Sequence, residues 1–376
     1  MATETATPAI PSPSPSPLPT ETPVPPTATS TATAVPASAT ATGAADATVG
    51  ATPSLTPSYT PVPATPTSPP PPTATPTPAL TRESLLRHWP ATEQSRVVLV
   101  RHSGAWAGDQ PDPAVVLQML DEGLRTLAGA GDVQAVWQAL FEPHERVLLK
   151  VNCIAYGGPT QPAVAYAVAQ RLQEAGLPAE NVLIFDRTDR ELESAGYRLN
   201  DGGAGVQCHG ASGKGSVATL SQATVKFFRE LDDYHALINV PTPKQHDTAG
   251  ISVALKNHYG SVDRPGSLHG NFCDPAIAEL NAQPNIRAKT RLIVGAALNV
   301  SPRDWNRPER ENALLLSFDP VAHDTVARDI LIRHREAQGV DSGFIINRSS
   351  HLRTAQELQL GATGADLIEL QEVVLA

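Results

Sequence analysis

From Arg96 onwards, short apolar segments alternate with helical segments, and this alternation constrains the fold more than any other feature. The predicted strands are RVVLVR (96–101), RVLLKVN (146–152), NVLIFD (181–186), HALINV (235–240), RLIVGAALN (291–299) and ALLLSF (313–318). Helices are predicted over 113–129, 161–176 and 319–334, the last with Asp319 as N-cap and Pro320 at its first position. Strands that are apolar throughout indicate a mostly parallel sheet with helices on both faces, so we expect an α/β fold.

The first 79 residues have a different composition from the rest of the chain. They contain 21 of the 36 Pro residues, no Lys or Arg, and only three acidic residues. A segment with so few large apolar side chains cannot offset the entropy lost on ordering. We therefore predict that residues 1–79 are a disordered Pro/Thr/Ser/Ala-rich linker and that residues 80–376 form the α/β domain.

Charge and hydropathy restrict the partners of the chain. Its net charge is −10, which argues against nucleic-acid binding, and no apolar run is long enough to span a membrane. A long N-terminal Pro/Thr linker is typical of domains tethered outside a bacterial membrane. We therefore expect an extracytoplasmic protein, secreted or tethered at the cell surface, whose membrane contact is limited to an anchor encoded upstream of Met1. The chain itself contains no visible export signal.

Two other patterns exclude familiar sites. The three Cys residues are odd in number and include no CxxC pair, so neither a disulfide scaffold nor an iron–sulfur cluster is expected. The Gly-rich stretch DGGAGVQCHGASGKGS (201–216) lacks the spacing of a phosphate-binding loop, and we predict a flexible excursion or lid there.

Polar side chains gather where the predicted strands end. The chain has six Lys against twenty-two Arg, and three of the Lys lie at or after strand ends. Ligands of open parallel sheets bind beyond the carboxyl ends of the strands, so these side chains should converge. The predicted ligand-binding residues are Lys150, Asn152, Asp186, Asn239 and Asn257, and the predicted catalytic residues are His246, Lys244 and Lys256.

These residue types indicate recognition of an oxygen-rich anion. Lys and Asn donate to phosphate or carboxylate oxygens, and His246 could act as a general acid/base or as a metal ligand. A hydrogen-bonded turn histidine is the alternative for His246. In the loop that follows a later strand, Arg303, Asp304 and Trp305 are predicted substrate contacts.

The segment SLHGNFCDP (267–275) suggests a divalent metal, held by His246, His269 and Asp274. The alternative is that Cys273 is a buried small hydrophobic residue and that Asp274 caps a helix with Pro275 at its first position.

The stretch NVPTPKQHDTAGISVALKNHYG (239–260) resembles the family called domain of unknown function 362. It matches that family's pattern at Asn239, Pro241, Lys244, His246, Gly250, Lys256, Asn257 and Gly260. IAELN (277–281), SFDPVAHDTVA (317–327) and the C-terminal helix-turn-strand pattern at 355–370 are also similar, and the likeness covers about residues 96–373. The family's Pro after Lys150 is replaced by Val151, and the resemblance implies no particular reaction.

We therefore expect an α/β domain that binds a small anionic molecule, as an enzyme that could use a divalent metal. The alternatives are a non-catalytic module that binds a solute or polymer, and a structural role in which the Lys and Asn side chains tie strand ends to helix caps.

Overall fold

A computed structural model describes residues 80–86, 94–154, 157–303 and 307–376. The predicted linker, residues 1–79, lies outside the described residues. The central feature is an eight-stranded sheet in the order β16-β1-β15-β12-β9-β4-β5-β6. Its strands are β1 (Ser95–His102), β4 (Val147–Val151), β5 (Val182–Phe185), β6 (Gln207–His209), β9 (Ala236–Val240), β12 (Thr290–Gly295), β15 (Ala313–Ser317) and β16 (Ile368–Leu375).

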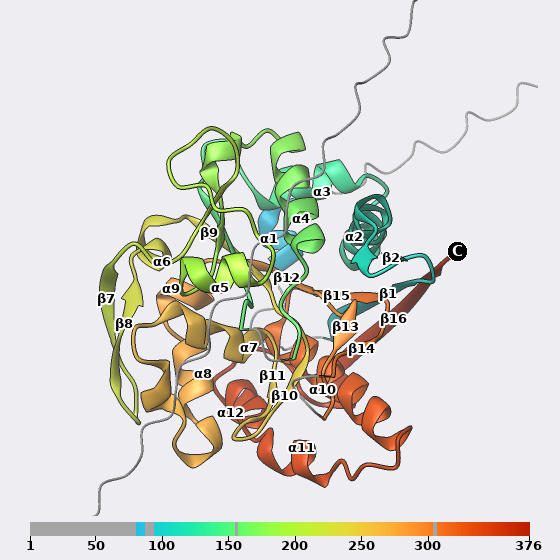
Figure 1. The fold of residues 1–376 in the computed structure, drawn as a ribbon, viewed down its shortest axis with the longest axis vertical. Helices are drawn as coiled ribbons and strands as arrows, with labels where there is room; N and C mark the ends of the chain where they lie inside the picture. Colours follow the sequence, from blue (N-terminus) through green and yellow to red (C-terminus); the bar gives the residue numbers. More distant parts are fainter. Residues whose placement is uncertain (1–79, 87–93, 155–156, 304–306) are drawn as a thin grey trace, which may run out of the picture. The chain divides into compact units, whose positions relative to one another are not determined.

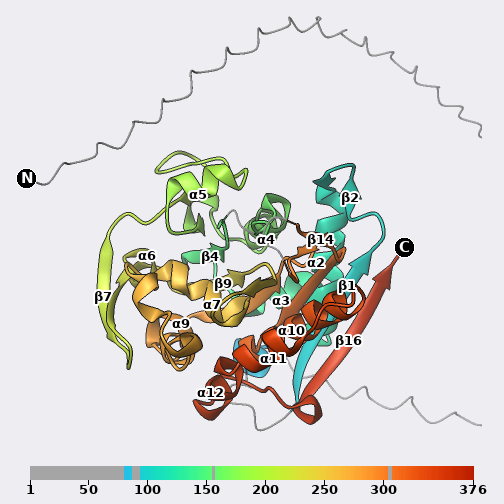
Figure 2. The same cartoon turned by 60° about the horizontal axis from the view of Figure 1, so that its bottom comes forward.

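The sheet is mostly parallel, because only β15 runs antiparallel to its neighbours β1 and β12. The other neighbouring pairs, from β16 with β1 to β5 with β6, are parallel. In Figures 1 and 2, β16 and the β7–β8 hairpin lie at opposite ends of the domain; β7 is Lys214–Thr219 and β8 is Thr224–Phe228. The fold class predicted from the alternating apolar runs is confirmed.

Helices cover both faces of this sheet (Figure 1). The side chains of Val98 and Val100 in β1 belong to one apolar core, whereas Val97 and Leu99 belong to the other. This alternation follows from the two-residue side-chain period of a strand. The first core includes α2 (Pro113–Ala128), α3 (Val133–Leu140) and α4 (Pro162–Glu174), and the second includes α7 (Ala254–Asn257), α8 (Ala276–Asn281), α10 (Pro320–Glu336) and α12 (His351–Glu357).

Shorter elements connect these layers. The remaining helices are α1 (Arg82–Leu86), α5 (Asp189–Ser194), α6 (Glu230–Asp233), α9 (Pro284–Arg287) and α11 (Gly343–Arg348). Small two-stranded sheets pair β2 (Trp106–Ala107) with β3 (Gln110–Pro111), β10 (Lys244–His246) with β11 (Gly250–Ser252), and β13 (Asn299–Val300) with β14 (Glu309–Arg310). No helix within the described ranges is both long and apolar enough to cross a membrane.

Capping explains where the long helices begin. Asp319 accepts hydrogen bonds from the backbone N–H groups of Val321 and Ala322, and Pro320 occupies the first turn, as predicted. The predicted cap at Asp274 is wrong: Pro275 is the N-cap residue of α8 and no side chain caps this helix. The chain enters α8 through three successive left-handed residues, Asn271 to Cys273, followed by Asp274, which lies one position before the N-cap.

The Gly-rich stretch at 201–216 does not act as a lid over a site in this structure. It contains the edge strand β6 and the first residues of β7, and the Gln207 amide donates to the carbonyls of Gly203 and Gly205. The prediction missed β6 because three residues at the sheet edge carry little apolar signal.

Candidate functional site

A pocket of about 340 Å³ opens at the carboxyl ends of β4, β5 and β9. The chain passes from β4 to β5 on one side and later returns to β9 on the other side of β4, so the pocket lies at the topological switch point. Register places Lys150 of β4 beside Asn239 of β9 and Phe185 of β5. Eight of the ten predicted site residues line it, namely Lys150, Asn152, Asp186, Lys244, His246, Lys256, Asn257 and His269.

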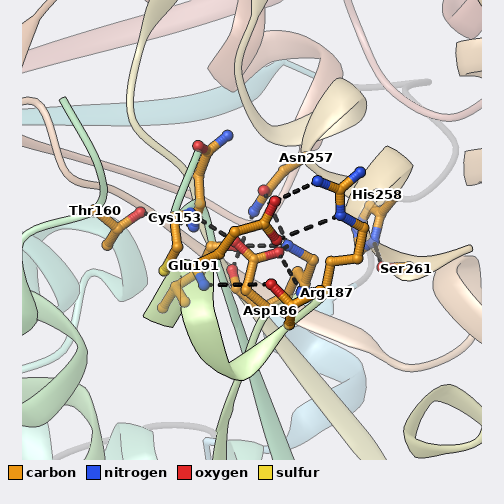
Figure 3. A network of polar contacts seen from close by, with 12 residues as sticks. Cys153, Thr160, Asp186, Arg187, Glu191, Asn257, His258 and Ser261 are labelled. Atoms are coloured by element: carbon orange, nitrogen blue, oxygen red, sulfur yellow. Dashed lines mark hydrogen bonds and ion pairs between the residues drawn. The ribbon is translucent and has the colours of Figure 1, made fainter. Parts of the chain in front are cut away.

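Lys150 and Asp186 form a buried ion pair at the base of the pocket. The Lys150 Nζ lies 2.7 Å from Asp186 Oδ1, and the two side chains are 1% and 5% exposed. The ammonium also donates to the Val151 carbonyl at 2.6 Å and to Asn257 Oδ1 at 3.3 Å, so its three protons have acceptors within the protein. Asp186 in turn accepts the backbone N–H groups of Cys153 and Arg187. Figure 3 shows this network around Asp186.

Asn239 and Asn257 tie β9 to the short helix α7. Asn257 Nδ2 donates to Asn239 Oδ1 at 2.8 Å and to the Lys150 carbonyl at 3.1 Å. Asn239 Nδ2 donates to the Ala254 carbonyl at 2.8 Å, so its amide is directed at the protein interior. Both Asn side chains therefore use most of their hydrogen bonds to position α7, which carries Lys256.

Lys244 projects from β10 across the strand ends. Its Nζ donates to Asn152 Oδ1 at 2.8 Å and to the Ile154 carbonyl at 3.2 Å. Burial lowers the pKa of Lys244 to about 7, and the Asp186 carboxylate opposes this shift.

Lys256 occupies another wall of the pocket. Its Nζ lies 3.3 Å from His269 Nε2 and 4.1 Å from the centre of the Tyr259 ring. The side chain is buried, and burial lowers the pKa of Lys256 to about 8. Within the described part of the chain, Lys256 makes no ion pair with a carboxylate. It therefore differs from Lys150, whose charge is matched by Asp186.

His246 is fixed by the turn between β10 and β11. Its Nδ1 accepts the backbone N–H groups of Thr248 at 3.1 Å and Ala249 at 3.2 Å, so the neutral ring carries its proton on Nε2. Burial lowers the pKa of His246 to about 3, with a further contribution from Lys256. The ring stacks on His269 with 5.4 Å between centroids. His246 is thus a hydrogen-bonded turn histidine that also lines the pocket.

Comparison with known proteins places this site within one family domain. Residues 147–329 match the model described as "Domain of unknown function (DUF362)". This segment is a DUF362 domain. All the residues that form the pocket lie inside the matched range.

Other comparisons add no functional information about the DUF362 domain. A crystal structure of a Thermotoga maritima protein is similar at 13% sequence identity and a TM-score of 0.34. The alignment covers 68% of this chain and 60% of that protein, so the chain spans less than two thirds of its length. No curated protein matches the chain.

The predicted metal ligands are not assembled in the DUF362 domain. Among the described residues, no group of three or more His, Cys, Asp or Glu side chains is placed to hold a metal ion. His246 directs Nδ1 to backbone amides, and His269 Nε2 faces Lys256. Asp274 does not line the pocket, and its Oδ1 is buried without a hydrogen-bond partner. Cys273 is fully buried, as the alternative interpretation proposed.

Several pocket residues were not predicted. Arg187 and Glu191 form an ion pair at the pocket lining, and Tyr259 supplies the aromatic face below Lys256. The sequence contained a signal for each of these two contacts, namely a spacing of three or four residues. Glu191 lies four residues after Arg187, and Tyr259 lies three residues after Lys256.

The loop predicted to contact substrate is described only in part. Arg303 lies 3.5 Å from the carboxylate of Glu309 and does not line the pocket. Asp304 and Trp305 lie outside the described residues.

Proposed function

We propose that the DUF362 domain binds a small anionic molecule, carrying a carboxylate or a phosphate, in the pocket at the strand ends. The observation that carries this proposal is Lys256. This residue is 7% exposed and lines the pocket, and within the described residues it forms no ion pair with a carboxylate; its Nζ lies 3.3 Å from His269 Nε2 and 4.1 Å from the centre of the Tyr259 ring. A buried ammonium without a counter-charge is costly, so an incoming anion would be stabilised there.

The charge of the whole lining supports the same conclusion. Four cationic side chains, Lys150, Arg187, Lys244 and Lys256, line the pocket, against the two carboxylates Asp186 and Glu191. Lys and Arg donors in a partly desolvated cavity favour carboxylate and phosphate oxygens. The volume of about 340 Å³ is at the small end for ligand sites, which favours a metabolite-sized ligand over a polymer.

Thermal unfolding of the full chain tests this proposal. Dialysed protein is titrated with inorganic phosphate, citrate and pyruvate, and at least one should raise the melting temperature in a saturable manner. At a ligand concentration one hundred times the dissociation constant, binding should increase the free energy of unfolding by about 2.7 kcal/mol. The Lys256→Met variant should lose this response. Without ligand it should be as stable as the wild type or more so, because Met fills the same space without a buried charge.

Lys226→Met is the matched control, since Lys226 is exposed on β8 and away from the pocket. It should keep the full response to ligand. If Lys256→Met lowers the melting temperature of the ligand-free protein and no anion stabilises the wild type, Lys256 has a structural role and the proposal fails. Export and surface tethering remain a prediction from the Pro/Thr-rich segment, to be tested by locating the protein in cell fractions.

A further inference from the structure

Lys256 has a neighbour that an anion-binding lysine does not require. His269 Nε2 lies 3.3 Å from the Lys256 Nζ, and His269 Nδ1 lies 3.0 Å from the carbonyl oxygen of Pro265. Because a carbonyl can only accept, Nδ1 carries the ring proton and Nε2 presents its lone pair to the amine. The Lys256 amine thus contacts a base, the His269 ring, which is oriented by the Pro265 carbonyl. An activated nucleophile has this arrangement.

Charge favours the neutral forms of both groups. A protonated His269 would set two cations against each other, and the pKa of His269 is lowered by burial and by Lys256. Burial lowers the pKa of Lys256 from 10.5 to about 8, which makes the neutral amine roughly 300-fold more abundant at neutral pH than in an exposed lysine. A lysine that only neutralised an anion would gain nothing from a base at this distance.

Lys244 is also buried, but its surroundings are different. Its Nζ donates to the amide oxygen of Asn152 and the backbone carbonyl of Ile154, and neither group can take a proton at neutral pH. Burial lowers the pKa of Lys244 to about 7, but a carboxylate bound beside it would hold the proton on this amine, so we assign Lys244 to hold an anionic group. Lys256, whose Nζ lies 3.3 Å from the base His269, is assigned to attack an electrophile. Both line the same pocket.

We propose that Lys256 forms a Schiff base with the carbonyl group of a small 2-oxo carboxylate while Lys244 holds the carboxylate. This rests on the anion-binding function proposed above and names its substrate class. The neutral Nζ attacks the carbonyl carbon and forms the C–N bond, and His269 Nε2 takes a proton from the nitrogen. His269 gives this proton to the carbonyl oxygen, which becomes a hydroxyl. His269 Nε2 then takes the second proton from the nitrogen and gives it to the hydroxyl, which leaves as water as the C=N bond forms. The water contains the carbonyl oxygen and the two amine protons, and no oxidant or reductant is consumed.

The linkage can be trapped chemically. The full chain is incubated with glyoxylate, pyruvate or 2-oxoglutarate and then treated with borohydride, whose hydride converts an imine into a stable secondary amine. Peptide mass mapping should find at least one of the three compounds, less one oxygen atom, on Lys256. Lactate has the carboxylate of pyruvate but a hydroxyl in place of the keto group, and it should leave no adduct.

Three variants separate the possible causes. Lys256→Arg keeps the positive charge but cannot form an imine, so the adduct should disappear. His269→Gln removes the base while retaining a hydrogen-bonding side chain, and the trapping rate should fall at least tenfold. Lys226→Met should trap at the wild-type rate, because this side chain is exposed and outside the pocket.

The outcomes distinguish this inference from the function on which it rests. If pyruvate, citrate or phosphate stabilises the wild type but none of the three oxo acids gives an adduct on Lys256, anion binding stands and the Schiff base is refuted. An adduct on Lys244, or one spread over exposed lysines as in the unfolded chain, also refutes it. If neither stabilisation nor adduct is found, both proposals fail.

Discussion

Replacing Asp186 by Asn should destabilise the domain by about 3–5 kcal/mol, because it leaves a buried ammonium without its counter-charge. The Lys150 Nζ lies 2.7 Å from Asp186 Oδ1, and both side chains are at least 95% buried. The carboxylate also accepts two backbone N–H groups, and the amide of Asn has a single oxygen to serve the same donors. A loss of this size is a large part of the stability of an ordinary domain.

Urea denaturation of the full chain, followed by tryptophan fluorescence, measures this loss. Glu191→Gln is the matched control, because it makes the same carboxylate-to-amide change in a more exposed pair with Arg187, and it should cost less than about 1 kcal/mol. Adding Lys150→Met to Asp186→Asn should recover part of the loss, since the unpaired charge is then absent. A cost below about 1 kcal/mol for Asp186→Asn would show that the pair is hydrated, and Lys150 would then have to be considered a ligand-binding residue.

Two further predictions concern pH and close packing. His334 contacts the carboxylates of Glu309 at 2.9 Å and Glu311 at 2.6 Å, and the hydrogen bond to Glu311 is the main cause of its raised pKa. The resulting stabilisation should be complete below a pH of about 6.5 and lost as pH rises through the folded-state pKa. His334→Gln should remove this dependence in unfolding curves, and an unchanged curve would contradict it. At Gly260, a Cβ atom would lie 2.8 Å from both Lys150 Nζ and Asp186 Oδ1, so Gly260→Ala should cost about 1–3 kcal/mol in urea denaturation. Gly266→Ala, which meets nothing within 4 Å, should cost little; equal costs for the two variants would refute the packing argument.

The central strands and long helices could be predicted because local sequence determines them. β4, β5, β9, β12 and β15 each contain at least three consecutive apolar residues, a pattern typical of strands in a sheet buried on both faces. β6 and the β7–β8 hairpin could not be predicted in the same way, since short strands at the sheet edge or outside it are polar or rich in Gly. Their position depends on pairing with distant segments, which local pattern does not encode.

The convergence of the site was predictable for a topological reason, but the roles of its residues were not. Lys150, Asp186 and Lys244 follow strand ends, and a parallel sheet brings such ends to one edge. The direction in which a histidine ring nitrogen points could not be predicted in this way, because it depends on the turn that holds the ring. His246 directs Nδ1 to the amides of its own turn, and this contact removes it from the predicted metal set.

The three lysines of the site illustrate how one residue type acquires different properties from its neighbours. Lys150 faces a carboxylate, Lys244 contacts amide and carbonyl oxygens, and the Lys256 amine lies 3.3 Å from an imidazole nitrogen. A carboxylate holds the proton on a buried amine, whereas an imidazole lone pair can receive it. The Lys150–Asp186 ion pair at the base of the pocket supports the strand ends. Lys256 has no such structural ion pair within the described residues, so its amine can take part in chemistry. If Lys256 is the reactive amine, its loss should abolish the adduct without destabilising the fold, whereas disruption of the Lys150–Asp186 pair should affect stability first.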